Sequence, residues 1–135
     1  MKVQLTSTHH FAAAHRLHNE RRDPEWNRRV FDKCNHDHGH GHTYGLEVTV
    51  EGDIDPETGY VMDFKELKRI VDERVVRNLE RRHLNFDVDF LRGINPTAEN
   101  IAVAIWTRLS GALPGTELKR ITLHETGKNS VVYEG

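Results

Sequence analysis

The sequence predicts an α+β fold in which a four-stranded antiparallel sheet carries two helices on one face. Two segments near the N-terminus alternate apolar and polar residues with the period of two that strands show. Two central segments instead repeat apolar residues at helical spacing, and two short alternating segments close the chain. The predicted order is therefore strand, strand, helix, helix, strand, strand. A length of 135 residues is that of a single domain, which we take to span residues 1–135.

The strands are predicted from alternation and from the turn residues that separate them. The first covers residues 3–17 and the second residues 40–51, each with one largely apolar face. Residues 19–37 between them are charged and irregular, so we predict a long loop there. The closing strands cover residues 118–125 and 130–133, with turn-forming residues between them.

The two helices are predicted from their start signals and their apolar stripes. The first covers residues 63–79, because Asp63 and Glu66 have the spacing of a capping box, with Asp in place of the usual Ser or Thr. The second covers residues 95–111, with Pro96 expected in its first turn. Both stripes are apolar on one side only, so each helix is expected to lie on the sheet.

The charge balance and the cysteine count exclude several classes of protein. The chain has 19 basic and 21 acidic residues and a formal net charge of -2, so no broad basic field is available for nucleic acid or an anionic membrane. No apolar run reaches the roughly 20 residues that span a bilayer, and the N-terminal residues lack the apolar core of a secretory signal. We therefore expect a cytoplasmic protein whose partner is neither nucleic acid, nor a membrane, nor another large polyanion. The single cysteine cannot form an internal disulfide, so it is either a buried inert thiol or a working one.

Ten histidines, four of them at alternate positions just after the cysteine, suggest a metal site. If His36, His38, His40 and His42 lay on one strand, the outer two would be roughly 20 Å apart, so one ion cannot bind all four. The strand pattern selects His40 and His42, and His15 is the third candidate because it ends the apolar face of the first strand. Three histidines with an open fourth position are typical of catalytic zinc. The alternative is that these are ordinary polar histidines at a strand end.

Five separated motifs, in order along nearly the whole chain, resemble those of one enzyme family. They are Phe11-Ala12-Ala13-Ala14-His15-Arg16-Leu17, Cys34-x5-His40-Gly41-His42-x-Tyr44, Val61-Met62-Asp63-Phe64, Asn95-Pro96-Thr97-Ala98-Glu99-Asn100 and His124-Glu125-Thr126. The family is that of the 6-pyruvoyl tetrahydropterin synthases, which includes the 6-carboxytetrahydropterin synthases of queuosine biosynthesis. The resemblance implies the tunnelling fold, assembled into a barrel-like homohexamer of two stacked trimers with active sites at subunit interfaces. It also implies Zn2+ as cofactor and 7,8-dihydroneopterin triphosphate, a pterin triphosphate, as substrate.

The resemblance also implies roles for individual residues. The zinc ligands would be His15, His40 and His42. Cys34 matches the catalytic thiol, and we expect nearby positive charge to lower its pKa so that the thiolate removes a proton from the substrate. Glu125 matches the carboxylate that anchors the pterin ring, and Thr97 matches a residue that contacts the pterin. Without the resemblance, the alternative interpretation of Cys34 is a small buried hydrophobic residue, that of Glu125 is a solvated charge, and that of Thr97 is a helix cap.

One segment departs from the family pattern. Where the family has an Asp-His pair that assists proton transfer, this chain has Glu80 and Arg81, and the nearest imidazole is that of His83. Glu80 and His83 are therefore candidate catalytic residues, whereas arginine, with a pKa above about 12, is a poor proton shuttle. The departure motivates a second hypothesis: a non-catalytic or altered-specificity homologue that binds pterins.

The sequence therefore leaves three functions open. The leading hypothesis is a zinc-dependent lyase that converts the triphosphate to 6-pyruvoyl tetrahydropterin or, with loss of acetaldehyde and triphosphate, to 6-carboxytetrahydropterin. The five residues between Cys34 and His40 resemble the pyruvoyl branch. The second hypothesis is the non-catalytic pterin-binding homologue. The third is a structural zinc protein, which would unfold when the metal is chelated.

Overall fold

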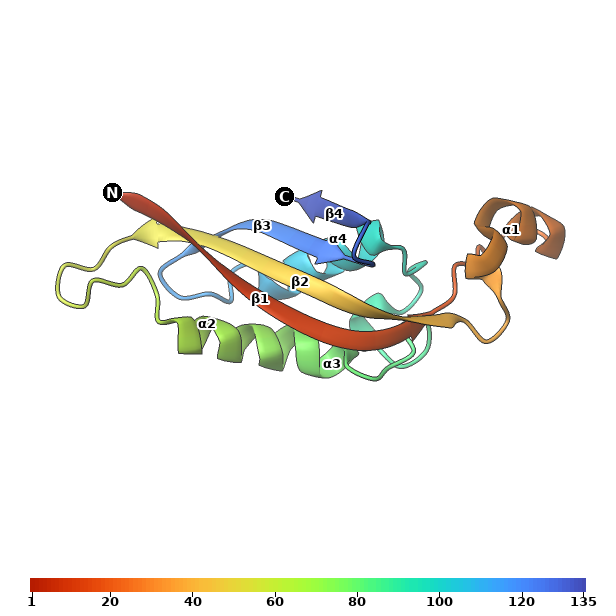
Figure 1. Ribbon diagram of the computed structural model, residues 1–135, viewed down its shortest axis with the longest axis horizontal. Coiled ribbons are helices and arrows are strands. Elements are labelled where there is room, and N and C mark those ends of the chain that lie inside the picture. Colours follow the sequence, from red (N-terminus) through yellow and green to blue (C-terminus); the bar gives the residue numbers. More distant parts are fainter.

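The computed structural model describes residues 1–135 and has the predicted α+β architecture, with one four-stranded sheet in the order β1-β2-β3-β4 (Figure 1). All neighbouring strands are antiparallel. The long β1–β2 pair runs in unbroken register, from Lys2 opposite Asp53 to His15 opposite His40. The strands are β1 (Lys2–His15), β2 (His40–Asp53), β3 (Glu117–His124) and β4 (Ser130–Tyr133).

The first predicted helix is present, but its hydrogen bonding changes midway. It consists of α2 (Phe64–Val71), a π-helical turn (Asp72–Val76) and α3 (Arg77–Leu79). Asp63 caps it by accepting a hydrogen bond of 2.8 Å from the Lys65 backbone N–H. The predicted capping box is wrong, because the Glu66 carboxylate accepts hydrogen bonds from Arg69 rather than from the Asp63 backbone. An arginine one turn away is a stronger partner for an exposed carboxylate than a neutral N–H group.

The second predicted helix is α4 (Ala98–Leu109), which begins later than expected. Thr97 is its cap and accepts a hydrogen bond of 3.2 Å from the Asn100 backbone N–H. Pro96 therefore precedes the cap and does not lie in the first turn. This placement frees the Pro96 carbonyl for a contact outside the helix.

The loop predicted at residues 19–37 is wrong, because the segment contains a helix, α1 (Pro24–Phe31), and a 3-10 turn, η1 (Asp32–Asn35). Asp23 caps α1 by accepting from the Trp26 backbone N–H at 2.7 Å. Pro24 occupies the first turn. The charged composition concealed these start signals, since only Trp26, Val30 and Phe31 of α1 are large and apolar. Figure 1 shows α1 projecting beyond the ends of β1 and β2, away from the other helices.

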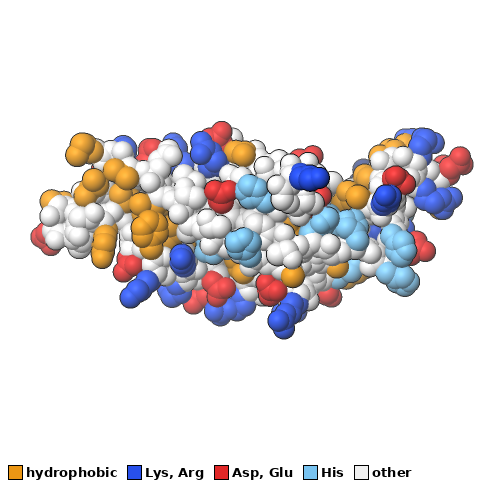
Figure 2. Space-filling model, viewed as in Figure 1, with side chains coloured by type: hydrophobic (Ala, Val, Ile, Leu, Met, Phe, Trp, Pro, Cys, Tyr) orange, Lys and Arg blue, Asp and Glu red, His pale blue; other side chains and the backbone are white.

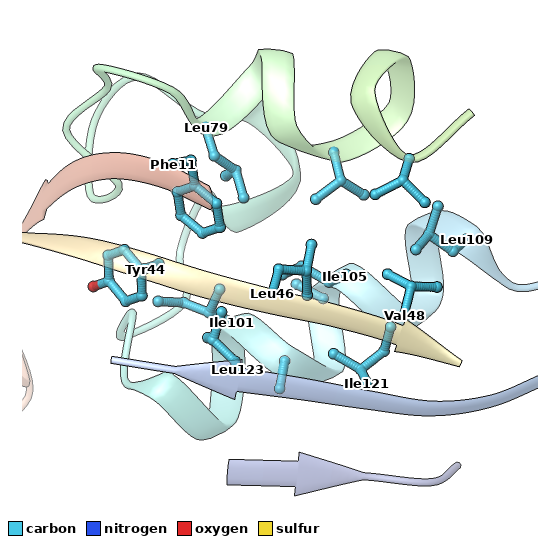
Figure 3. Close-up of a cluster of buried hydrophobic side chains, with 14 of the residues drawn as sticks. Phe11, Tyr44, Leu46, Val48, Leu79, Ile101, Ile105, Leu109, Ile121 and Leu123 are labelled. Atoms are coloured by element: carbon cyan, nitrogen blue, oxygen red, sulfur yellow. The ribbon is translucent and has the colours of Figure 1, made fainter. Parts of the chain in front are cut away.

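The core lies between the sheet and the helices α2, α3 and α4. In Figure 3, Leu46 and Val48 of β2 lie opposite Ile101, Ile105 and Leu109 of α4. These five side chains are fully buried. Nearer the other end of β1 and β2, the rings of Phe11 and Tyr44 are stacked with centroids 4.9 Å apart. Apolar burial at alternate strand positions thus fixes the face that each strand turns toward the helices.

Residues 80–84, which follow α3, cover the free edge of β1 near its end. The Arg81 N–H donates to the Ala12 carbonyl at 2.6 Å, and the Leu84 N–H donates to the Ala14 carbonyl at 2.8 Å. Arg81 adopts a positive φ of 60°, which is uncommon for a residue with a side chain. A short three-residue 3-10 turn, η3 (Asp89–Leu91), then leads toward α4. None of the helices combines the length and apolar character that crossing a bilayer requires.

Candidate metal centre and active site

Three histidines converge at the end of the β1–β2 pair. The register sets His15 directly opposite His40 and places His42 opposite Ala13. The Nε2 atoms of His15 and His40 are 3.2 Å apart, and one ring nitrogen from each of the three histidines lies within 4.8 Å of the others. These are the three residues that strand alternation selected from the sequence. In the view of Figure 2, histidines gather at the junction between the sheet and the α1 end of the molecule.

The arrangement fits a transition-metal ion with imidazole ligands. Two nitrogens at about 2.05 Å from one tetrahedral zinc are roughly 3.4 Å apart, close to the separation of the His15 and His40 nitrogens. Two further ring nitrogens in the cluster, His40 Nδ1 and His42 Nε2, are buried without any hydrogen-bond partner. An unpartnered buried nitrogen is costly unless a ligand satisfies it. His36 and His38, by contrast, are exposed.

A backbone carbonyl orients the His15 ring. His15 Nδ1 lies 2.7 Å from the Pro96 carbonyl oxygen, so Nδ1–H donates and Nε2 is left with its lone pair for a metal. The Tyr44 hydroxyl lies 3.3 Å from the same Nδ1. Sequence reasoning missed both contacts, although the Asn95-Pro96-Thr97 motif marked the segment. The carbonyl of Pro96 is free because this residue precedes the helix cap. Its partner could not be predicted, because only the three-dimensional position of α4 brings this carbonyl to His15.

Two of the three histidines, His15 and His40, have lowered pKa values that favour the neutral ring. Burial, together with the neighbouring His40 and His42, lowers the pKa of His15 to about 4, against the opposing effect of its hydrogen bond to Pro96. Burial also lowers the pKa of His40. Only a neutral imidazole offers a lone pair to a metal, so the environment keeps these rings ready to bind one.

Cys34 lies in η1 beside the cluster, where its carbonyl accepts a hydrogen bond of 2.8 Å from the Leu17 N–H. Burial raises the pKa of its thiol, and the negative charges of Glu125 and Asp32 raise the pKa further. The prediction that nearby positive charge lowers the Cys34 pKa is therefore wrong, because the charge effects on the thiol come from carboxylates and not from the positive charge that we expected.

Glu125 follows the last residue of β3 and reaches the same cluster. Its Oε1 atom lies 4.0 Å from His42 Nε2, and its side chain is 26% exposed. Its negative charge adds to burial in raising the pKa of the buried Tyr44 phenol. A partly buried carboxylate thus lies near His42 and acts by its charge on Cys34, while its role in binding the pterin stays a prediction.

The structure does not bring Glu80 and Arg81 into this cluster. The Glu80 carboxylate faces the Ala12 backbone N–H at 3.4 Å, and the Arg81 side chain is 90% exposed. His83 lies near the cluster, because a Cβ on Gly39 would come within 3.0 Å of its Nε2 atom and its charge contributes to the lowered pKa of His15. Thr97 serves as a helix cap, and its role with a pterin stays a prediction.

Arg81 and His83 instead line an open groove of about 620 Å³ at the covered edge of β1. Ala12, His42 and Asp87 line the same groove. Because the groove is open, residues 81–83 are accessible to a ligand that approaches from outside the chain. His83 shares the groove with His42 and acts by its charge on His15, and the catalytic roles of Glu80 and His83 stay predictions.

The fold and the site together define a class: an α+β protein whose sheet carries a three-histidine metal-type centre with an adjoining thiol and carboxylate. Comparison with known proteins gives the family. A model described as 6-pyruvoyl tetrahydropterin synthase matches residues 4–135, so the chain belongs to this family of lyases. The predicted resemblance is confirmed, and with it the fold.

Three relatives illustrate the range of the family. The chain is 44% identical to the 6-pyruvoyl tetrahydrobiopterin synthase of Poecilia reticulata over 131 residues, covering 97% of this chain and 89% of the relative. The solved structure of Caenorhabditis elegans 6-pyruvoyl tetrahydropterin synthase has a TM-score of 0.92 and 34% identity, covering 100% of this chain and 96% of that one. A dihydroneopterin monophosphate aldolase of Pyrococcus furiosus is 49% identical over 96 residues, which are 70% of this chain and 77% of the aldolase.

Proposed function

We propose that this chain is a zinc-dependent tetrahydropterin synthase that converts 7,8-dihydroneopterin triphosphate to 6-pyruvoyl tetrahydropterin. The observation that carries the proposal is the convergence of His15, His40 and His42 beside Cys34 and Glu125. The names of the animal relatives and the five-residue spacing between Cys34 and His40 support the pyruvoyl product. Formation of 6-carboxytetrahydropterin would instead place the enzyme in queuosine biosynthesis.

Each residue of the site has a separate role in the proposed reaction. The three histidines would hold zinc, which when bound polarises the side-chain hydroxyls of the substrate and makes the neighbouring C–H group more acidic. Cys34 would take a proton from that carbon as its thiolate. Glu125 would accept paired N–H bonds from the aminopyrimidine edge of the pterin, and Thr97 would border the ring. Burial of the cluster strengthens each of these polar interactions by excluding water.

The Cys34 thiolate needs positive charge that the surrounding side chains do not supply, since burial and carboxylates raise its pKa. Arg81 is a source of such charge, because its side chain is almost fully exposed and free to meet a second subunit. In this proposal Arg81 stabilises the thiolate by charge instead of moving a proton. Glu80 and His83 would position that segment against β1.

We also propose that the chain assembles into a homohexamer of two trimers. β1 and β4 are the edge strands of the sheet, and residues 81–84 cover only the end of β1. Exposed strand edges offer unpaired N–H and carbonyl groups to strands of other subunits. Analytical ultracentrifugation tests this directly: six chains per particle are expected, and a monomer would reject the assembly.

The function is tested by incubating the zinc-loaded protein with 7,8-dihydroneopterin triphosphate and identifying the products by mass spectrometry. Cys34→Ala tests the thiol, and the exposed Lys128→Ala is the matched control. A pyruvoyl product that requires Cys34 supports the proposal. Formation of 6-carboxytetrahydropterin would support the enzyme class but assign the enzyme to a different pathway. Unchanged substrate with wild type would contradict the proposal.

Arg81→His separates an active enzyme from the non-catalytic alternative, which the comparisons do not support. If Arg81 acts by charge, the histidine variant keeps activity within about tenfold of wild type, because a single exposed charge contact is worth about 1 kcal/mol or less. Activity that appears only in the variant would show that wild type is a pterin-binding homologue.

A further inference from the structure

A polar pocket of about 500 Å³ lies between the end of β1 and the segment that contains α1 and η1. Cations outnumber carboxylates in its lining, since Arg16, Arg28 and Lys33 face only Asp32 and Asp37. The mechanism proposed above uses none of these side chains. The lining residues are Arg16, His18, Pro24, Arg28, Asp32, Lys33, Asn35, His36 and Asp37.

One wall of the pocket is built by buried asparagine contacts. The Arg16 backbone is held from both sides by Asn85, whose Oδ1 accepts from Arg16 N–H at 2.8 Å and whose Nδ2 donates to Arg16 O at 2.7 Å. The Arg16 side chain donates through Nε to the Asn35 carbonyl at 3.2 Å and is only 24% exposed. Arg16 is therefore fixed in place before any ligand binds.

The same asparagine framework sets the tautomer of His18. Asn35, which is itself buried, donates through Nδ2 to His18 Nδ1 at 2.9 Å and to the Leu17 carbonyl at 2.8 Å. An amide NH2 group only donates, so His18 Nδ1 accepts and Nε2 carries the proton. The His18 backbone N–H donates to Asn95 Oδ1 at 3.1 Å. The pocket thus has a fixed N–H donor beside a fixed guanidinium.

Two further cations of the lining, Arg28 and Lys33, have no acidic partner. Arg16 pairs with Asp37 at 3.4 Å, but neither Arg28 nor Lys33 has a carboxylate within 4.0 Å. Elsewhere on the surface, Arg69 shows the usual arrangement, with two glutamates around one arginine. Two free cations together with a preorganised guanidinium favour a multiply charged anion.

The chain connects this pocket directly to the metal site. Arg16 follows the metal-site residue His15, and Lys33 precedes Cys34. The turn from His36 to Gly39, closed by a hydrogen bond of 2.9 Å, returns the chain to β2 at His40. His36, which lines the pocket, is also one of the charges that lower the pKa of His40, so the pocket adjoins the three-histidine cluster. A ligand whose reacting carbon lies at the histidines would therefore have its tail beside the pocket.

We propose that this pocket binds the phosphate chain of the substrate, with Arg28 and Lys33 as its main contacts and Arg16 and His18 as fixed donors. The proposal rests on the function proposed above. It also predicts a preference for a triphosphate over a monophosphate ester, the form named for the Pyrococcus furiosus relative, because the three cations of the lining favour a multiply charged anion.

Binding of neopterin and of neopterin triphosphate to the zinc-loaded protein tests the proposal, with pterin fluorescence as the readout. Wild type should bind the triphosphate at least about a hundredfold more tightly than neopterin, because several charge-assisted hydrogen bonds are added. The double variant Arg28→Gln/Lys33→Gln should lose at least about tenfold for the triphosphate and less than about twofold for neopterin. The matched control, Arg92→Gln/Lys128→Gln, has the same change in net charge and should alter neither affinity by more than about twofold.

The outcomes separate this proposal from the proposed function. Equal losses for both ligands in the double variant, or no loss for either, would overturn the phosphate pocket. If neopterin binds and the triphosphate adds no affinity, the pterin function stands and the pocket is rejected. If neopterin does not bind but the triphosphate binds through Arg28 and Lys33, the pocket stands and the pterin function is rejected.

Discussion

The face that β1 and β2 share changes its character along its length. In the middle of the pair, Phe11 and Tyr44 stack within the core, whereas the next positions on the same face carry His42, His15 and His40. Both halves obey the same alternation, but one half packs against helices and the other forms a polar cluster. The comparison shows that the core determines how the three histidines converge, because apolar burial fixes the register and the register sets His15 opposite His40.

The largest expected effect is on the polar half of this face. His42→Ala should weaken zinc binding at least about a hundredfold, because removal of a ligand costs more than removal of a residue that supports a ligand. Zinc content after dialysis and competition with a chelator measure the effect. The control is the exposed His38→Ala, which should bind zinc like wild type. The unfolding midpoint of the metal-free variant should barely change, and a large loss of stability would show that the histidines belong to the core.

The apolar half should respond in the opposite way. Leu46 is fully buried beneath α4, so Leu46→Ala should lower the free energy of unfolding by about 2–5 kcal/mol. Urea denaturation measures this loss, with Val132→Ala, at a position 55% exposed, as the control. Zinc stoichiometry in the folded fraction should stay at one per chain. A folded variant that no longer binds zinc would mean that the two halves are not separable.

Acid should destabilise the metal-free protein through the polar half of this face, because it protonates the buried imidazole of His15. The folded pKa of His15 is about 4, below the unfolded value of 6.5, so the unfolded chain binds the proton more tightly. The stability of the metal-free protein is then complete above about pH 6.5 and falls as the pH approaches 4, by up to about 3 kcal/mol from this residue. His15→Gln should flatten part of that slope in urea titrations at several pH values. An unchanged slope would contradict the assignment.

The smallest expected effect concerns the cap of α4. Thr97→Ala should cost about 1 kcal/mol of stability, because the Asn100 N–H loses its partner, and Thr97→Ser should restore most of it. Thermal unfolding measures both variants. If Thr97 also borders the pterin, the alanine variant should bind neopterin less tightly than the serine variant does. Equal neopterin binding by the two variants would show that Thr97 acts only as the helix cap.

Residues whose roles follow from local pattern were predictable from the sequence. Strand alternation alone placed His15, His40 and His42 on one face, and the element order predicted the α+β fold. Non-local placement was not predictable. The hydrogen bond from His15 to Pro96 and the carboxylates that raise the pKa of Cys34 depend on segments distant in sequence. The helix α1 was missed because its few apolar residues lie in a strongly charged segment.

The central claim is that the core-facing strands present three imidazoles to one metal and leave its fourth position open. X-ray absorption spectroscopy of the zinc-loaded protein tests this claim most directly. We expect three imidazole nitrogens at about 2.0–2.1 Å and a light atom in the fourth position, with no sulfur in the first shell. A zinc–sulfur distance of about 2.3 Å from Cys34 would contradict the account, because it would close the site and leave no thiol to act as a base.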